Sequence, residues 1–363
     1  MVQALPVLRF LKRAQPGSKI YWWLESNLVP LLEGDPDLEC VVPFHRDRWV
    51  APRHWLEHWQ SVRWMRKQAF DWVIDLQGLA RSGAFAWLAN GKLTIGLDEP
   101  REGARGFYDR IVPRPSFHTH AVDWYLGVLP LLNVAGPACS LAGTAGVSPA
   151  QSSPVEPFNS GQFVWLPERP EIAANIRQKW RIDDVHWIML QPGARWSNKR
   201  WPAAYYAELV SRLALTRPSI KFAILGSQDD RPLAQTIVAA APERCLDLTG
   251  QTSLPEMVEW IRNCDLMVTN DTGPMHVAAA LRKPLIALFG PTEPRRTGPY
   301  GQLENVLQLQ LPCIPCLSET CSYPKPMECL KAISPNIVLQ AVERQLDRIS
   351  ATFEPCQIQK VGQ

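Results

Sequence analysis

Short apolar runs alternate with stretches of helical periodicity along most of the chain, and turns rich in Gly, Pro, Asn or Asp separate them. Leu266–Thr269 is one such run, with β-branched residues and a length that suits a buried strand. The loop 270–274 interrupts the pattern, and a helix of small residues follows until Pro284 ends it. Leu285–Phe289 predicts the next strand. This alternation predicts an α/β fold with parallel sheets.

The same alternation divides the chain into two parts. Further strands are predicted at 19–24, 39–43, 72–76, 94–97, 163–166, 187–191 and 221–225. The chain opens on a predicted amphipathic helix, 2–14, rather than on a strand. Residues 140–162 are rich in Ser, Pro, Gly and Ala, as is typical of a linker. We therefore expect lobes over 1–140 and 163–333, a linker over 141–162, a last helix within 334–350 and a tail over 351–363.

The loop after Leu266–Thr269 has the composition of an anion site. A Gly-containing loop between a parallel strand and a helix presents unpaired N–H groups and the positive helix end, which suit phosphate. Gly273 lets the backbone approach the anion, His276 lies in the first helical turn, and Asp271 stands where a carboxylate accepts from sugar hydroxyls. The alternative is an ordinary turn capped by Thr272, with a satisfied histidine.

Two other loops add candidate ligands. The loop 192–202 follows strand 187–191 and carries Lys199, whose point charge suits a phosphate oxygen. A surface cation is the alternative. Asp229 and Asp230 follow the next strand, where they either accept from a ribose hydroxyl or an adenine amine, or cap a helix.

Composition narrows the class of protein. The 363 residues suffice for two domains, and 46% hydrophobic with 20% charged residues indicates a folded chain. A net charge of +3 is too small for a general nucleic-acid binder. No signal peptide opens the chain, and no apolar run reaches the roughly 18 residues that span a bilayer. With nine cysteines, these features predict a cytoplasmic protein, either free or peripheral on the inner face of the plasma membrane.

A cysteine cluster and a basic stretch complete the candidates. Cys313, Cys316, Cys321 and Cys329 predict a structural zinc site or an iron–sulfur cluster, and buried or free thiols are the alternative. No catalytic metal is expected, because no His or carboxylate neighbour offers an open site. The basic, Trp-rich stretch 45–67 is either a solvated helix face with Trp anchors or a patch for an anionic acceptor.

These motifs resemble the signature of the heptosyltransferase family, family nine of the glycosyltransferases. The matching residues are Asp271-Thr272-Gly273, His276, Ala279-Ala280, Pro284, Phe289-Gly290-Pro291-Thr292 and Gly298-Pro299-Tyr300-Gly301. Similar matches occur at 192–202 and at Asp75-Leu76-Gln77-Gly78 with Arg81-Ser82. The resemblance implies a GT-B architecture, in which two Rossmann-like doubly wound lobes face across a cleft and the last helix crosses back to the first lobe.

The resemblance also implies substrates and residue roles. The second lobe is expected to bind ADP-heptose or a related nucleotide-sugar, and the first a lipopolysaccharide inner-core sugar or another glycan, for inverting transfer without a required metal. Lys199 and Asp271 are the expected catalytic residues. The expected donor-binding residues are Lys199, Arg195, Ser197, Asp229, Asp230, Thr252, Asp271, Thr272, Gly273 and His276. The expected acceptor-binding residues are Arg63, Arg66, Lys67, Gln77 and Arg81.

The general base has no candidate in its usual place. In relatives, a strand and a Gly-Asp loop precede the segment matching Ala4–Leu8, and that Asp is taken as the base. Here neither is present, so either Met1 is a misplaced start or a truncation, or the enzyme lacks this base, with Asp75 and Asp271 as substitutes. The rival function is a non-catalytic nucleotide-sugar-binding protein or a truncated, inactive transferase. A dehydrogenase fits worse, because no G-x-G-x-x-G follows a predicted strand.

Overall fold

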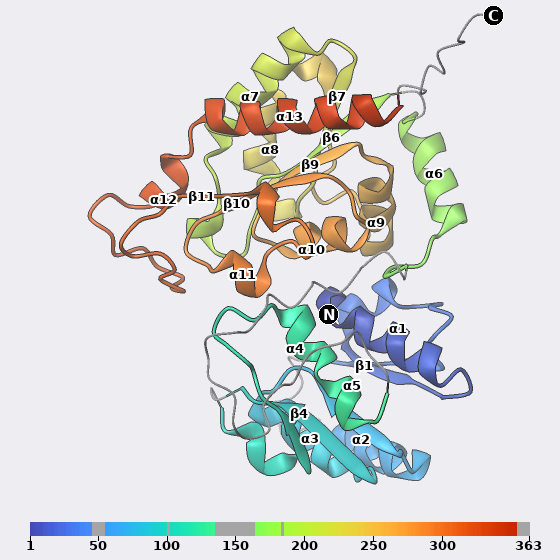
Figure 1. Ribbon diagram of the computed structural model, residues 1–363. Helices are drawn as coiled ribbons and strands as arrows, with labels where there is room; N and C mark the ends of the chain where they lie inside the picture. Colours follow the sequence, from blue (N-terminus) through green and yellow to red (C-terminus); the bar gives the residue numbers. More distant parts are fainter. Residues whose placement is uncertain (46–54, 100–101, 135–163, 183–184, 354–363) are drawn as a thin grey trace, which may run out of the picture. The chain divides into compact units, whose positions relative to one another are not determined.

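The computed structural model describes residues 1–45, 55–99, 102–134, 164–182 and 185–353 (Figure 1). The chain forms two compact units, Met1–Pro167 and Glu168–Gln363. The predicted linker, 141–162, and the end of the predicted tail lie outside the described residues. Within the described residues, no helix is long and apolar enough to cross a membrane.

The first unit holds two parallel sheets. Strand β1 (Tyr21–Glu25) pairs with β2 (Cys40–Phe44), and β4 (Leu93–Leu97) pairs with both β3 (Trp72–Asp75) and β5 (Arg110–Val112). Its helices are η1 (Val2–Ala4), α1 (Leu5–Ala14), η2 (Ser26–Leu31), α2 (Trp55–Gln68), α3 (Ala80–Ala89), η5 (Ala104–Phe107), α4 (Ala121–Leu126) and α5 (Val128–Leu131). The chain thus opens on a helix, as predicted.

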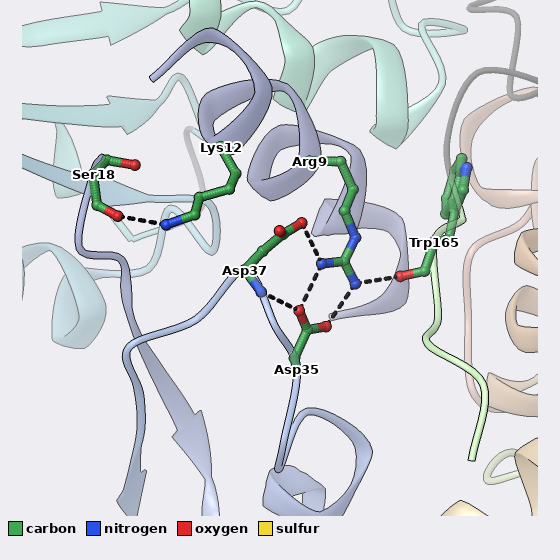
Figure 2. A network of polar contacts seen from close by, with 6 residues as sticks. All are labelled: Arg9, Lys12, Ser18, Asp35, Asp37 and Trp165. Carbon is green, nitrogen blue, oxygen red and sulfur yellow. Dashed lines mark hydrogen bonds and ion pairs between the residues drawn. The ribbon is translucent and has the colours of Figure 1, made fainter. Parts of the chain in front are cut away.

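A buried arginine ties the segment before the second unit to the first (Figure 2). Arg9 of α1 donates to both carboxylate oxygens of Asp35 at 2.6 Å, to Asp37 at 2.7 Å and to the carbonyl of Trp165 at 2.8 Å. Burial lowers the pKa of Arg9, but its bonds to Asp35 and Asp37 outweigh burial, and its pKa is raised. The guanidinium therefore stays charged and joins three segments that are distant in sequence.

The same contact corrects one predicted element. Residues 163–166 were expected to form the first strand of the second lobe, but Val164–Leu166 form no strand, and Phe163 lies outside the described residues. Trp165 and Leu166 are buried within the first unit, and Arg9 takes the Trp165 carbonyl. Trp165 and Leu166 are apolar because they fill part of the first unit's core. A short apolar run of this kind cannot be distinguished from a strand by periodicity alone.

The second unit is built on one parallel sheet of six strands, in the order β11-β10-β9-β6-β7-β8. The strands are β6 (His186–Gln191), β7 (Ile220–Ile224), β8 (Cys245–Asp247), β9 (Leu266–Asn270), β10 (Leu285–Phe289) and β11 (Val306–Gln308). The central strands β9 and β10 are buried at every position, which explains the apolar runs 266–268 and 285–289 within them.

Helices cover both faces of this sheet (Figure 1). The helices α7 (Ala203–Thr216), α8 (Arg231–Val238) and α13 (Pro335–Phe353) share one apolar core with it. On the other face lie α6 (Pro170–Trp180), α9 (Leu254–Asn263) and α10 (Gly273–Ala280), where Trp260 meets Trp187 with ring centroids 5.6 Å apart. Shorter helices are η7 (Ser197–Lys199), η8 (Gln228–Asp230), η9 (Pro242–Arg244), α11 (Pro294–Thr297), η10 (Leu303–Asn305) and α12 (Glu328–Lys331). The predicted α/β class is confirmed.

Candidate functional site

Three loops meet at one edge of the second unit's sheet. Strands β10, β9 and β6 are neighbours and parallel, so the loops that leave their carboxyl ends lie side by side. In doubly wound sheets this edge is where ligands bind. The three loops supply Thr292, Asp271 and Lys199 respectively.

These three side chains converge on one carboxylate oxygen. Lys199 Nζ lies 2.6 Å from Asp271 Oδ2, and Thr292 Oγ1 donates to the same oxygen at 2.7 Å. Within the described residues, Oδ1 of Asp271 accepts no hydrogen bond. Lys199 Nζ also lies 4.6 Å from the ring centroid of Trp196, a cation–π distance. The Asp271 carboxylate is thus held in place while one of its oxygens stays available to a ligand.

Buried amides fix the loops that carry these groups. Asn270, the last residue of β9, accepts from Trp201 N at 3.1 Å and donates to Pro192 O at 2.7 Å, which ties both ends of the Lys199 loop to the strand. Gln308 of β11 donates to Thr292 O at 2.7 Å and to Gly290 O at 3.1 Å. Lys199 and Thr292 therefore project from anchored backbone.

The N-terminus of α10 is open beside this cluster. Gly273 is exposed, its φ lies outside the left-handed region, and a Cβ built on it would meet no atom within 4 Å. Gly193 differs, because its Cβ would come within 2.5 Å of the Asp230 carboxylate. Thr272 holds the N-cap position, as predicted, yet its side chain makes no capping hydrogen bond. The fold does not require glycine at 273, whereas close approach of a ligand would.

The other predicted donor residues are distributed around this centre. Arg195 and Ser197 are exposed on the Lys199 loop, and His276 is half-buried in the first turn of α10. Asp230 accepts from Ser227 N at 2.9 Å and Ser227 Oγ at 2.8 Å, which is the capping alternative. Within the part of the chain that the structure describes, Thr252 and Asp229 form no hydrogen bond or ion pair with Lys199 or Asp271, and they follow other strands of the same sheet.

Asp75, the candidate substitute base in the first unit, has both carboxylate oxygens engaged in hydrogen bonds. Asp75 Oδ1 accepts from Gln77 N at 2.8 Å and Gly78 N at 3.3 Å, and its Oδ2 accepts from Tyr108 OH at 2.7 Å. Burial and then the Asp75 charge raise the pKa of Tyr108 well above its usual value, so the phenol remains a donor. A carboxylate with both oxygens engaged is better suited to shape the 75–78 turn than to accept a proton.

The predicted acceptor residues fall in two places within the first unit. Gln77 and Arg81 have exposed side chains beside the Asp75 turn, at the start of α3. Arg63, Arg66 and Lys67 are exposed on α2. The structure therefore does not join the five into one cluster through any hydrogen bond among the described residues.

The four cysteines gather at one pocket but do not close on a metal site. Cys313, Cys316, Cys321 and Cys329 line it together with Asn198, whose Oδ1 is buried without a partner among the described residues. Burial, reinforced by the neighbouring thiols, raises the pKa of Cys329. All four are free thiols, and no group of three or more Cys, His, Asp or Glu in the described chain is arranged to hold a metal ion. Zinc binding stays a prediction.

The sequence analysis did not assign a role to Thr292 or Asn270. Thr292 lies within the matched Phe289–Thr292 motif, so its place next to the strand end was visible, but its partner was not. Asn270 could have been noticed as a polar residue directly after the predicted strand Leu266–Thr269. Both act through contacts with loops far away in sequence.

Comparison with known proteins identifies the family. Residues 56–326 match the model of glycosyltransferase family 9 (heptosyltransferase). The chain is 30% identical to lipopolysaccharide heptosyltransferase 1 of Pseudomonas aeruginosa, over 89% of this chain and 84% of that protein. It is 42% identical to lipooligosaccharide heptosyltransferase 2 of Haemophilus influenzae over a shorter region, 32% of this chain and 35% of that one.

Solved structures agree on the fold. The structure of E. coli ADP-heptose LPS heptosyltransferase II superposes with a TM-score of 0.72 at 23% identity, covering 96% of both chains. E. coli heptosyltransferase WaaC with ADP-2-deoxy-2-fluoro heptose gives a TM-score of 0.67 at 23% identity, over 94% of this chain and 95% of that one. The predicted GT-B fold and the predicted family are thereby confirmed, and the chain belongs to glycosyltransferase family 9, the heptosyltransferase enzymes.

Proposed function

We propose that this enzyme transfers a heptose from ADP-heptose, or a related sugar from its nucleotide, to a lipopolysaccharide inner-core or similar glycan acceptor, with inversion. The relatives are named for heptosyl transfer to lipopolysaccharide, and a structural neighbour carries an ADP-heptose analogue. The observation that carries the proposal is the Lys199–Asp271–Thr292 cluster beside the open N-terminus at Gly273.

The donor site would work through charge. When the glycosidic bond breaks, negative charge develops on the departing diphosphate. Lys199 can share its positive charge between Asp271 and a phosphate oxygen, and the first N–H groups of α10, with His276, provide further donors. These groups would take the place of a divalent cation. The open Oδ1 of Asp271 would accept from a sugar hydroxyl and orient the transferred ring.

Arg195, Ser197, Thr272 and Thr252 would complete the donor site, and Gln77 and Arg81 with the basic residues of α2 would meet the acceptor. The general base remains unassigned, because both oxygens of Asp75 accept hydrogen bonds and the charge of Asp271 is paired with Lys199. That observation favours, as a second candidate, a protein that binds the nucleotide-sugar without transferring it. We place the reaction on the cytoplasmic face of the membrane. Zinc at the four cysteines would stabilise the fold without taking part in transfer.

The test is isothermal titration of the chain with ADP and ADP-heptose, with UDP-glucose as the control, followed by a transfer assay that measures released ADP. Binding of both adenine ligands with transfer is the expected result. Binding without transfer would establish the second candidate instead. Failure of both adenine ligands to bind would refute the donor site.

A further inference from the structure

Helix α2 exposes a continuous face. On its inner side, Val62 and Met65 pack in a small core with Ala89 of α3. On its outer side, the exposed residues include Leu56, Trp59, Arg63, Arg66 and Lys67, with the uncharged Gln60 also exposed. Spacings of three, four, three and one place these five side chains on one stripe of an α-helix. We call them the α2 face.

The first half of the α2 face is apolar. Leu56 is 73% exposed and Trp59 is 62% exposed. A third exposed side chain, Trp87, is 57% exposed on α3, next to Leu88, whose carbonyl accepts from Arg66 Nε at 2.9 Å, so the end of α3 lies beside the second half of the α2 face. Large apolar side chains exposed one turn apart, as Leu56 and Trp59 are, indicate a contact surface. Tryptophan in particular prefers the boundary between water and lipid.

The second half of the α2 face is cationic. Arg63 and Lys67 form no ion pair among the described residues, and the described side chains of the face include no acid. A second copy of this face would therefore meet like charges, which disfavours a two-fold dimer through it. The protein's net charge of +3 is small, so the local concentration of cations is not an average property of its surface.

We propose that the α2 face seats the protein on the anionic surface of a lipid bilayer. Leu56 and Trp59 enter the headgroup region, while Arg63, Arg66 and Lys67 contact lipid phosphates. This inference deepens the proposed function and rests on it in one respect, because it names the surface that brings the enzyme to an acceptor carried by a membrane. It involves none of the second unit's donor residues.

The experiment is co-sedimentation of the full chain with vesicles of equal parts phosphatidylglycerol and phosphatidylcholine, and with pure phosphatidylcholine vesicles, in the absence of nucleotide. We expect binding to the anionic vesicles only, weakening as salt rises from 0.1 to 1 M and the Debye length falls from about 10 to about 3 Å. Removing two charges with Arg63→Gln and Lys67→Gln together should weaken binding about 25-fold, near five-fold per charge. Arg66 is kept because it also bonds Leu88.

Matched variants distinguish binding through the α2 face from nonspecific binding to vesicles. Leu56→Ser with Trp59→Ser should abolish most binding, whereas Leu215→Ser and Lys325→Gln, at positions whose side chains are equally or more exposed in the second unit, should not change it. Melting temperatures confirm that each variant is folded. The proposal would be overturned if the chain bound neutral and anionic vesicles equally, or if the second-unit variants lost as much binding as the α2 variants. Self-association through α2 without vesicle binding would overturn it as well. Because no nucleotide is present, failure here leaves the donor-site titration to stand or fall by itself.

Discussion

The two units each bury a cation against a carboxylate, and the two pairs differ in how many oxygens of the carboxylate accept a hydrogen bond. The Arg9 and Asp35 side chains are 7% and 0% exposed, and the guanidinium also bonds Asp37 and a carbonyl. The Lys199 and Asp271 side chains are 18% and 7% exposed, and Asp271 keeps one oxygen without a donor.

This difference separates a structural role from a functional one. A buried pair whose carboxylate oxygens both accept hydrogen bonds, as those of Asp35 do, leaves little for a ligand to gain, but removing one partner leaves a buried charge without its counter-ion. The Lys199–Asp271 pair lies where three loops meet, so Lys199 can exchange part of its contact with Asp271 for a contact with a ligand at a small cost in free energy. The Arg9 pair should therefore control stability, and the Lys199 pair should control affinity.

The largest expected effect is on folding. Arg9→Met leaves Asp35 buried without its cation, so the free energy of unfolding of the first unit should fall by about 3–5 kcal/mol. Urea denaturation followed by circular dichroism measures it, with Lys325→Met as the control, because that exposed pair with Glu328 contributes about 0–1 kcal/mol. A loss no larger than the control's would show that the Arg9 network is not a stability element.

Next in size is donor affinity. Lys199→Ala removes a charged contact to the diphosphate, and ADP binding should weaken by about 1–3 kcal/mol. Calorimetry measures the affinity, and thermal denaturation should show little change because Thr292 still bonds Asp271. Unchanged affinity with the same melting temperature would remove Lys199 from the donor site.

Two glycines provide a paired test of similar size. Gly193→Ala drives a Cβ into the Asp230 carboxylate and should destabilise the second unit by about 1–3 kcal/mol. Gly273→Ala meets no neighbour and improves helix propensity, so stability should hold or rise slightly while ADP affinity falls. Should Gly273→Ala bind ADP as the parent does, the α10 terminus would not be the phosphate site.

The smallest effect concerns Thr292, which positions Asp271. Thr292→Val keeps the shape but loses the hydroxyl bond, worth about 0.5–1.5 kcal/mol, and should raise KM for the donor sugar more than Kd for ADP alone. Thr292→Ser keeps the hydroxyl and should restore the parent KM. If both variants changed KM equally, packing rather than the hydrogen bond would be responsible.

The sequence predicted most of the second unit because its strands are buried on both faces and its loops carry Gly, Pro and Asp at their ends. It also assigned Lys199 and Asp271, each on a loop after a predicted strand, to one donor site by family resemblance. It did not predict that Lys199 and Thr292 would both donate to one carboxylate oxygen of Asp271. Nor did it predict the hydrogen bond from Tyr108 to Asp75, because such contacts depend on strand order and side-chain length. The strand predicted at 163–166 was wrong, because local composition cannot show that the Trp165 carbonyl bonds Arg9 instead of a neighbouring strand.

The bond from Arg9 to the Trp165 carbonyl joins positions separated by 156 residues. Chains are synthesised from the N-terminus at about 5–20 residues per second, and contacts of long sequence separation form late in folding. The amphipathic helix α1 is therefore made early, while the last partner of its buried charge is made only after the rest of the first unit. At these rates residue 165 follows residue 9 by about 8 to 30 seconds, so the Arg9 guanidinium gains its last hydrogen-bond partner only after that interval.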